Sequence, residues 1–137
     1  IWAILKHWLT ICVRGLLRLH FMFSSCWGVM GGVGACPENL MAMKASADRL
    51  LGDNYEFSVL AAGRHQIPLA TMGVILGGNV RVGLEDSLIL PSGKMAESNA
   101  DQVAKIKTII EELGYEIATP DDVRQRLQLK GREKIKA

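Results

Sequence analysis

The segment from Gly77 to Asp86, GGNVRVGLED, constrains the fold more than any other part of the chain. Its residues alternate in polarity, which predicts a short β-strand entered through a glycine turn. The two faces of this strand would be Val80, Val82 and Leu84 on one side and Arg81, Gly83 and Glu85 on the other. An ordinary surface strand would bury the aliphatic face and leave the two charges in water.

The neighbouring segments favour a strand inside a parallel sheet. An apolar segment, 67–76, precedes it and a strong helical pattern, 98–113, follows, which together make an α-β-α unit. In an open doubly wound sheet both faces of such a strand are apolar, whereas in a closed barrel the inner face can turn polar. The alternation therefore predicts an α/β fold of the (β/α)8 barrel, or TIM-barrel, type. With 137 residues the chain is about half as long as the roughly 250-residue barrel.

Other periodic segments fit this architecture. Further helices are predicted over 37–51, from near Pro68 to 76 and after Pro120, and strands over 21–27 and 56–62. The strand over 21–27 is predicted to be buried. Residues 98–101, SNAD, resemble a capping box with aspartate in place of glutamate, and Val103, Ile106, Ile110 and Leu113 would form the buried stripe of that helix.

Two charges would lie near the mouth of such a barrel. Glu85, at the carboxyl end of the strand, would point into the mouth where barrels place their chemistry. Arg81 would lie on the same face, about 13 Å behind at about 3.3 Å per residue, so that only its long side chain approaches the carboxylate. A charge inside a barrel needs a partner. Both a functional pair and a structural ion pair fit this spacing.

The same ten residues, followed by 98–100 (SNA) and 118–120 (ATP), resemble the C-terminal part of the β-keto acid cleavage enzymes. That family includes the 3-keto-5-aminohexanoate cleavage enzyme of lysine fermentation. Segments 28–32 (GVMGG) and 58–64 (SVLAAGR) add to the resemblance, which runs from about Trp27 to Leu129. The resemblance implies a (β/α)8 barrel with a divalent metal, usually zinc. It also implies a transferase that condenses a β-keto acid with acetyl-CoA to give acetoacetate and a shortened acyl-CoA.

The resemblance also implies roles for three residues. Glu85 is expected to be a metal ligand, Arg81 a catalytic cation and Asp86 a catalytic acid that either orients Arg81 or moves a proton. The family's other metal ligands are a His-x-His pair on an early strand, which this chain lacks. The family usually has Asn where this chain has Ser87. The chain alone is therefore expected to be inactive. The alternative is a non-catalytic fragment that folds only by association.

Two loops are candidates for substrate or coenzyme binding. Residues 28–34 form a glycine-rich loop before a helix that opens near Pro37, where Gly31 and Gly32 could bring backbone N–H groups to a coenzyme phosphate. A turn whose residues need positive φ would also explain these glycines. Their spacing does not match the G-x-G-x-x-G pattern of dinucleotide-binding loops. Arg64, after the predicted strand 56–62, could meet an anionic substrate or the coenzyme, or simply be a solvated loop residue.

Composition changes along the chain. No acidic residue occurs before Glu38, and all tryptophans and cysteines lie within the first 37 residues. We therefore divide the chain into an uncertain segment, 1–23, the C-terminal half of a barrel, 24–129, and a basic tail, 130–137. A misread or truncated reading frame, a helix packed on the barrel and a membrane-surface helix all fit the first segment. Only seven uncharged residues separate Lys6 from Arg14, too few for the roughly 20 of a membrane span.

Charge and cysteine usage limit the partners. Sixteen basic and fourteen acidic residues give a net charge of +2, which is too balanced to predict nucleic-acid binding. The three cysteines lack metal-site spacing and indicate reduced thiols in a cytoplasmic protein. The expected partners are a β-keto acid and acetyl-CoA, and the full-length protein is expected to form a homo-oligomer.

Overall fold

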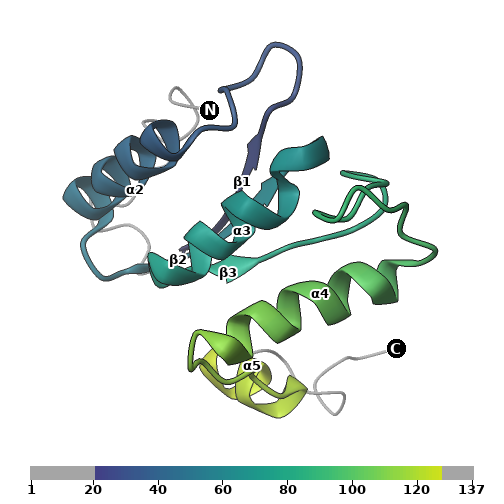
Figure 1. The fold of residues 1–137 in the computed structure, drawn as a ribbon. Helices are drawn as coiled ribbons and strands as arrows, with labels where there is room; N and C mark the ends of the chain where they lie inside the picture. Colours follow the sequence, from purple (N-terminus) through teal and green to yellow (C-terminus); the bar gives the residue numbers. More distant parts are fainter. Residues whose placement is uncertain (1–20, 128–137) are drawn as a thin grey trace, which may run out of the picture.

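The computed structural model describes residues 21–127 and contains a small parallel sheet with helices (Figure 1). Strands β1 (Phe21–Trp27), β2 (Tyr55–Ala61) and β3 (Asn79–Val80) lie in the order β1-β2-β3. Helices α2 (Pro37–Leu51) and α3 (Gln66–Ile75) connect them, with a short 3-10 helix, η1 (Gly63–His65), before α3. Helices α4 (Asn99–Glu112) and α5 (Pro120–Arg126) follow. The segments predicted over 1–23 and 130–137 lie almost entirely outside the described residues.

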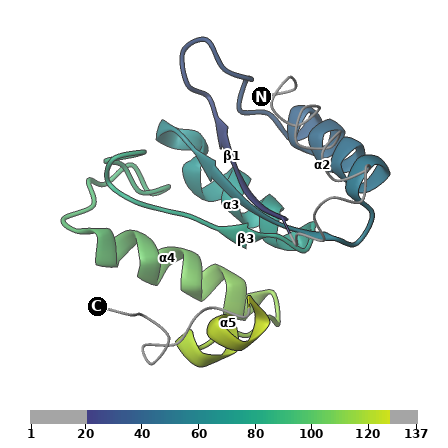
Figure 2. The same cartoon turned by 180° about the vertical axis from the view of Figure 1, so that it is seen from behind.

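The strands follow one another across the sheet in a single direction. Each crossover moves to the next strand, and right-handed crossovers that step the same way place their helices on the same face. Helix α3 lies in front of the sheet in Figure 1 and behind it in the reverse view of Figure 2. A doubly wound sheet reverses direction at one point, but within each of its halves the strands also step one way. The α/β class is confirmed, and the barrel itself stays a prediction.

The helix-facing side of the sheet forms the main core. One cluster joins the strands to α2 and α3 through Trp27, Phe57, Val59, Ala61, Leu40 and Leu69. A second cluster joins α3 to α4 through Ile67, Ala70, Ile106 and Ile110. Successive strand residues point to opposite faces, so the other face carries different side chains. There Ser24 and Cys26 are exposed, and the Ser58 hydroxyl donates a hydrogen bond to Ser24 Oγ at 2.8 Å.

The strand predicted over 21–27 is confirmed, but the prediction that it is buried is wrong on one face. Its side chains alternate, with Ser25 and Trp27 buried and Ser24 and Cys26 exposed. The buried pair faces the helices and the exposed pair faces away from them. A strand covered by protein on only one face needs this alternation.

The strand predicted through Glu85 is shorter than the sequence pattern indicates, since β3 ends at Val80. The Arg81 amide donates to Val59 O at 3.1 Å, and then the chain turns. The carbonyl of Gly83 accepts hydrogen bonds from the amides of Asp86 at 3.1 Å and Ser87 at 3.2 Å. In a strand, the Gly83 carbonyl would accept a hydrogen bond from a neighbouring strand. Here the turn bonds occupy it, so residues 83–87 form a compact loop, called here the Glu85 loop.

Helix α4 begins as predicted, because the Asp101 carboxylate accepts hydrogen bonds from the amides of Glu97 at 2.8 Å and Ser98 at 3.0 Å. Its predicted buried stripe is only half right. Ile106 and Ile110 are buried, but Val103 and Leu113 are 51% and 44% exposed. Val103 lies near the start of α4 and Leu113 just after its last residue, so the packing on α3 covers only the middle of the stripe.

We expect the isolated 137-residue chain to self-associate. In the sheet as described, β1 and β3 are the edge strands, and unpaired edges together with exposed apolar side chains promote association. No described helix is long and apolar enough to cross a membrane. Multi-angle light scattering at several protein concentrations would measure the self-association of the chain. A concentration-independent monomer with cooperative melting would contradict the expectation.

Candidate functional site

The carboxyl ends of the three parallel strands meet at one edge of the sheet, where three loops begin. The amide of Ala62, just after β2, donates to Trp27 O at the end of β1 at 2.9 Å. The amide of Gly63 donates to Asp86 O in the Glu85 loop at 2.7 Å. Backbone hydrogen bonds therefore tie the loops after β1, β2 and β3 together, and the Glu85 loop is held beside the loop after β2.

Arg81 is paired with two carboxylates at this edge. Its Nη2 contacts Glu85 Oε1 directly and lies 3.7 Å from Asp86 Oδ2. The Arg81 and Glu85 side chains are 48% and 60% exposed, whereas that of Asp86 is 14% exposed. Asp86 Oδ2 is buried and has no hydrogen-bond partner in the described part of the chain. The structure thus brings together all three residues for which the sequence predicted catalytic or metal-binding roles.

The predicted 13 Å separation of Arg81 from Glu85 is wrong. That distance assumes that the strand continues to Glu85, but the chain turns after Val80 and folds the carboxylate back toward the guanidinium. Glu85 Oε2 would lie 2.5 Å from a β-carbon added at Gly83. A side chain at position 83 would therefore occupy the space that the Glu85 carboxylate now fills.

The pair is charged over a wide pH range. The Glu85 backbone N–H, and then the Arg81 guanidinium, lower the pKa of the Glu85 carboxyl below its ordinary 4.5. The hydrogen bond to Glu85 raises the pKa of Arg81 in turn. Because the folded pKa of Glu85 is depressed, the pair's contribution is present above pH 4.5 and is lost as pH falls through the lowered value. At neutral pH the Arg81 cation is therefore held by carboxylates at this edge.

The predicted coenzyme loops lie at the same edge. Gly31 has φ of +79°, and the Gly32 amide donates to Val29 O at 2.9 Å, so these glycines form a turn. Arg64 lies in η1, is exposed and donates from Nε to His65 Nε2 at 3.3 Å. It forms no ion pair within residues 21–127. The turn accounts for the glycines, and the coenzyme roles of Gly31, Gly32 and Arg64 stay predictions.

The sequence analysis missed three side chains that hold the Glu85 loop. Gln66 Nε2 donates to Gly83 O at 2.8 Å, and Gln102 Nε2 donates to Ser87 O. Asn99 Oδ1 accepts from the Leu84 amide at 2.8 Å. One signal was available, because Gln102 lies four residues before Ile106 and therefore on the buried stripe of α4. A polar residue on an apolar stripe calls for a buried partner.

Among the described residues, no three Cys, His, Asp or Glu side chains gather into a group able to hold a metal ion. A catalytic zinc ion normally has three protein ligands. Glu85 is exposed and anionic at the strand ends, so it suits one ligand position. The described residues could therefore supply one ligand to a metal centre but do not form a complete centre by themselves.

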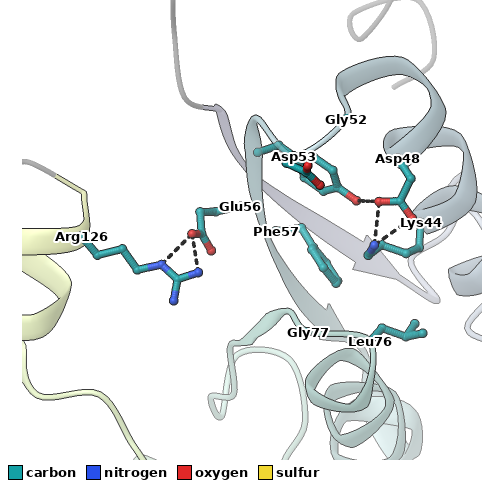
Figure 3. Close-up of a pocket in the computed structure, with 10 residues that line it drawn as sticks. Lys44, Asp48, Gly52, Asp53, Glu56, Phe57, Leu76, Gly77 and Arg126 are labelled. Atoms are coloured by element: carbon teal, nitrogen blue, oxygen red, sulfur yellow. Dashed lines mark hydrogen bonds and ion pairs between the residues drawn. The ribbon is translucent and has the colours of Figure 1, made fainter.

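A hollow lies at the opposite edge of the sheet, where β2 begins (Figure 3). It has a volume of about 190 Å³, and four of the charged side chains that line it form two ion pairs. Lys44 Nζ lies 2.7 Å from Asp48 Oδ1, and Arg126 Nη2 lies 2.6 Å from Glu56 Oε1. Barrel enzymes have their active sites at the carboxyl ends of the strands. We therefore take Arg81, Glu85 and Asp86 as the candidate active site.

Comparison with known proteins identifies the family. The pattern of the beta-keto acid cleavage enzymes matches residues 3–129, beginning well before Trp27, where the sequence resemblance began. A 3,5-dioxohexanoate:acetyl-CoA acetone transferase of Paraburkholderia graminis is 55% identical over 118 residues, which are 86% of this chain and 38% of that protein. A 3-keto-5-aminohexanoate cleavage enzyme of Acetoanaerobium sticklandii is 36% identical over 114 residues, 83% of this chain and 40% of that protein.

A third relative, a 3-oxoadipate:acetyl-CoA acetyltransferase of Cupriavidus necator, is 32% identical over 117 residues, 84% of this chain and 39% of that protein. The chain thus spans about two-fifths of the length of these curated relatives. The family match covers nearly all of the chain, including the strand ends and the Glu85 loop. The chain therefore belongs to the β-keto acid cleavage enzyme family, as its Gly77–Asp86 segment indicated.

Proposed function

We propose that this chain forms the C-terminal half of the barrel of a metal-dependent β-keto acid cleavage enzyme. The enzyme would condense a β-keto acid with acetyl-CoA to give acetoacetate and a shortened acyl-CoA. Family membership supports this proposal, as do two relatives whose names include acetyl-CoA. The observation that carries it is the Arg81 guanidinium, held between Glu85 and Asp86 where three parallel strands end.

In this reaction the carbon–carbon bond between the keto carbon and the α-carbon of the β-keto acid breaks. The α-carbon forms a new bond to the acetyl carbonyl carbon, whose thioester bond to the coenzyme A sulfur breaks. The released acyl group then bonds to that sulfur. Negative charge develops on enolate and alkoxide oxygens during these steps. The forked donors of Arg81 would stabilise that charge. Asp86, 3.7 Å from Arg81 and mostly buried, would orient the guanidinium or carry a proton.

The remaining assignments belong to the whole enzyme. Glu85 would supply one ligand to a divalent metal, most simply zinc, which when bound polarises a carbonyl oxygen. The other ligands would come from outside the described residues. The loop with Gly31 and Gly32, together with Arg64, would face the coenzyme. We further propose a closed barrel, a homo-oligomer and a cytoplasmic location for the full-length protein.

A chimera tests the proposed function. The segment of the Paraburkholderia graminis relative that aligns with this chain would be replaced by this chain's residues, and the chimera assayed with several β-keto acids and acetyl-CoA. We expect equal amounts of acetoacetate and the new acyl-CoA, measured by chromatography. A chimera that folds but forms neither product would favour the alternative, a non-catalytic chain that folds only by association.

The 137-residue chain alone is expected to bind zinc weakly and to form no acetoacetate. One carboxylate cannot replace the three ligands of a catalytic zinc site, and the described residues contain no group of three. Elemental analysis after dialysis would measure bound zinc, with the chimera as the loaded control. Stoichiometric zinc in the isolated chain would show that the chain holds a complete centre.

A further inference from the structure

Four hydrogen bonds from outside the Glu85 loop fix its backbone. Gly83 O accepts from Gln66 Nε2, and the Leu84 amide donates to Asn99 Oδ1, both at 2.8 Å. Asp86 O accepts from the Gly63 amide at 2.7 Å, and Ser87 O accepts from Gln102 Nε2. These contacts bracket Glu85 on both sides, and three come from side chains in the first turns of α3 and α4.

The two glutamines are unusual core residues. Gln66 and Gln102 are 1% and 0% exposed, and each turns its amide nitrogen to a loop carbonyl, which can only accept. The other end of each amide, Oε1, is buried without a hydrogen-bond partner in the described part of the chain. An unsatisfied buried acceptor destabilises the folded protein by about as much free energy as one hydrogen bond stabilises it. Folding stability alone therefore does not explain a glutamine at either position.

We infer that Gln66 and Gln102 are positioning residues, which set the place of Glu85 and Asp86 through the backbone of the Glu85 loop. This inference rests on the proposed function for its catalytic consequence. Both amides extend from helices that pack on each other through Ile67, Ala70, Ile106 and Ile110, so the loop is fixed to the helical layer. Asn99 adds the third side-chain contact, at the loop's outer bend.

The test replaces each glutamine with methionine in the chimera, because methionine keeps the length and fills the space without an amide. We expect kcat to fall about ten- to a hundredfold in Gln66→Met and Gln102→Met, since misplacement of a catalytic group by about 1 Å has that effect. KM for acetyl-CoA should change less than about twofold and Tm by less than about 3 °C, because removing the unsatisfied oxygen offsets the lost hydrogen bond. Gln125→Met, at an exposed position of α5, is the matched control.

A second measurement does not depend on activity. Amide hydrogen exchange in the 137-residue chain should show loop amides, among them those of Asp86 and Ser87, exchanging about tenfold faster in Gln66→Met than in the Gln125→Met control. Unchanged kcat with unchanged loop exchange would overturn the inference, and so would a loss of activity that follows a large fall in Tm. If the unsubstituted chimera forms no acetoacetate, the proposed function fails, and loop exchange still decides whether the glutamines hold the loop.

Discussion

Arg81→Lys is expected to lower kcat of the chimera about a hundredfold or more while leaving its zinc content unchanged. The Arg81 guanidinium contacts Glu85 and lies 3.7 Å from Asp86, and its planar fork can also direct donors at a developing oxyanion. Lysine keeps the charge but offers one ammonium group, so the donor geometry is lost. Loss of a single oxyanion donor costs about a hundred- to a thousandfold in rate.

Glu85→Gln separates the role of Glu85 from that of Arg81. The amide is nearly the same shape as the carboxylate but a far weaker metal ligand, so zinc and activity should fall together. Elemental analysis and acetoacetate formation are measured on the same samples. Arg124→Lys is the control, because Arg124 forms an exposed ion pair of 2.6 Å with Asp121, away from the strand ends. Full zinc occupancy in Glu85→Gln would remove Glu85 from the metal site, and normal turnover in Arg81→Lys would remove Arg81 from catalysis.

Trp27→Ala is expected to have the largest effect on folding, about 3–5 kcal/mol of destabilisation. Trp27 is fully buried at the end of β1 and packs in the cluster that joins the strands to α2 and α3. Its Nε1 also donates to Ser25 Oγ at 2.9 Å, so the change leaves a cavity and removes a buried hydrogen bond. Urea unfolding of the chimera, followed by circular dichroism, would measure the change.

Met30→Ala is the matched control for Trp27→Ala. Met30 is a large apolar residue three positions further along the chain, but it is 101% exposed. Removing its side chain should shift the unfolding free energy by less than about 0.5 kcal/mol. A similar loss in both variants would mean that Trp27 does not anchor the core, and that other contacts of β1 hold this edge together.

The sequence predicted two helices closely but overestimated the length of one strand. Helices over 37–51 and 98–113 follow from apolar spacing and helix starts, and the structure has them at 37–51 and 99–112. The strand through Glu85 failed because alternation over Val80 to Glu85 is also compatible with a turn. What decides between strand and turn is the set of partners that Gly83 O finds, and one of them, Gln66, is 17 residues earlier in the chain. Periodicity in a short window cannot detect such a partner.

The sequence likewise revealed some residues of the candidate site and not others. Arg81 and Glu85 were singled out because charged residues at the end of a predicted barrel strand suggest chemistry. Asp86, and the roles of all three residues, were predicted from the family resemblance. The glutamines that hold the loop were missed because their importance depends on tertiary contacts with backbone carbonyls, which carry no sequence signature. Gln102 was detectable in principle, as a polar side chain on an apolar stripe, but its partner Ser87 O was not.

The unlike faces of the sheet suggest where new substrate preferences could be engineered. Changes on the helix-facing side, at residues such as Val59, alter tightly packed contacts and risk unfolding the protein. Ser24 and Cys26 are exposed on the opposite face, on strand β1, which β2 separates from the strand that precedes Arg81. A mutant library restricted to Ser24, Cys26 and exposed Met30 would therefore explore chemistry near the strand ends while most of its members still fold.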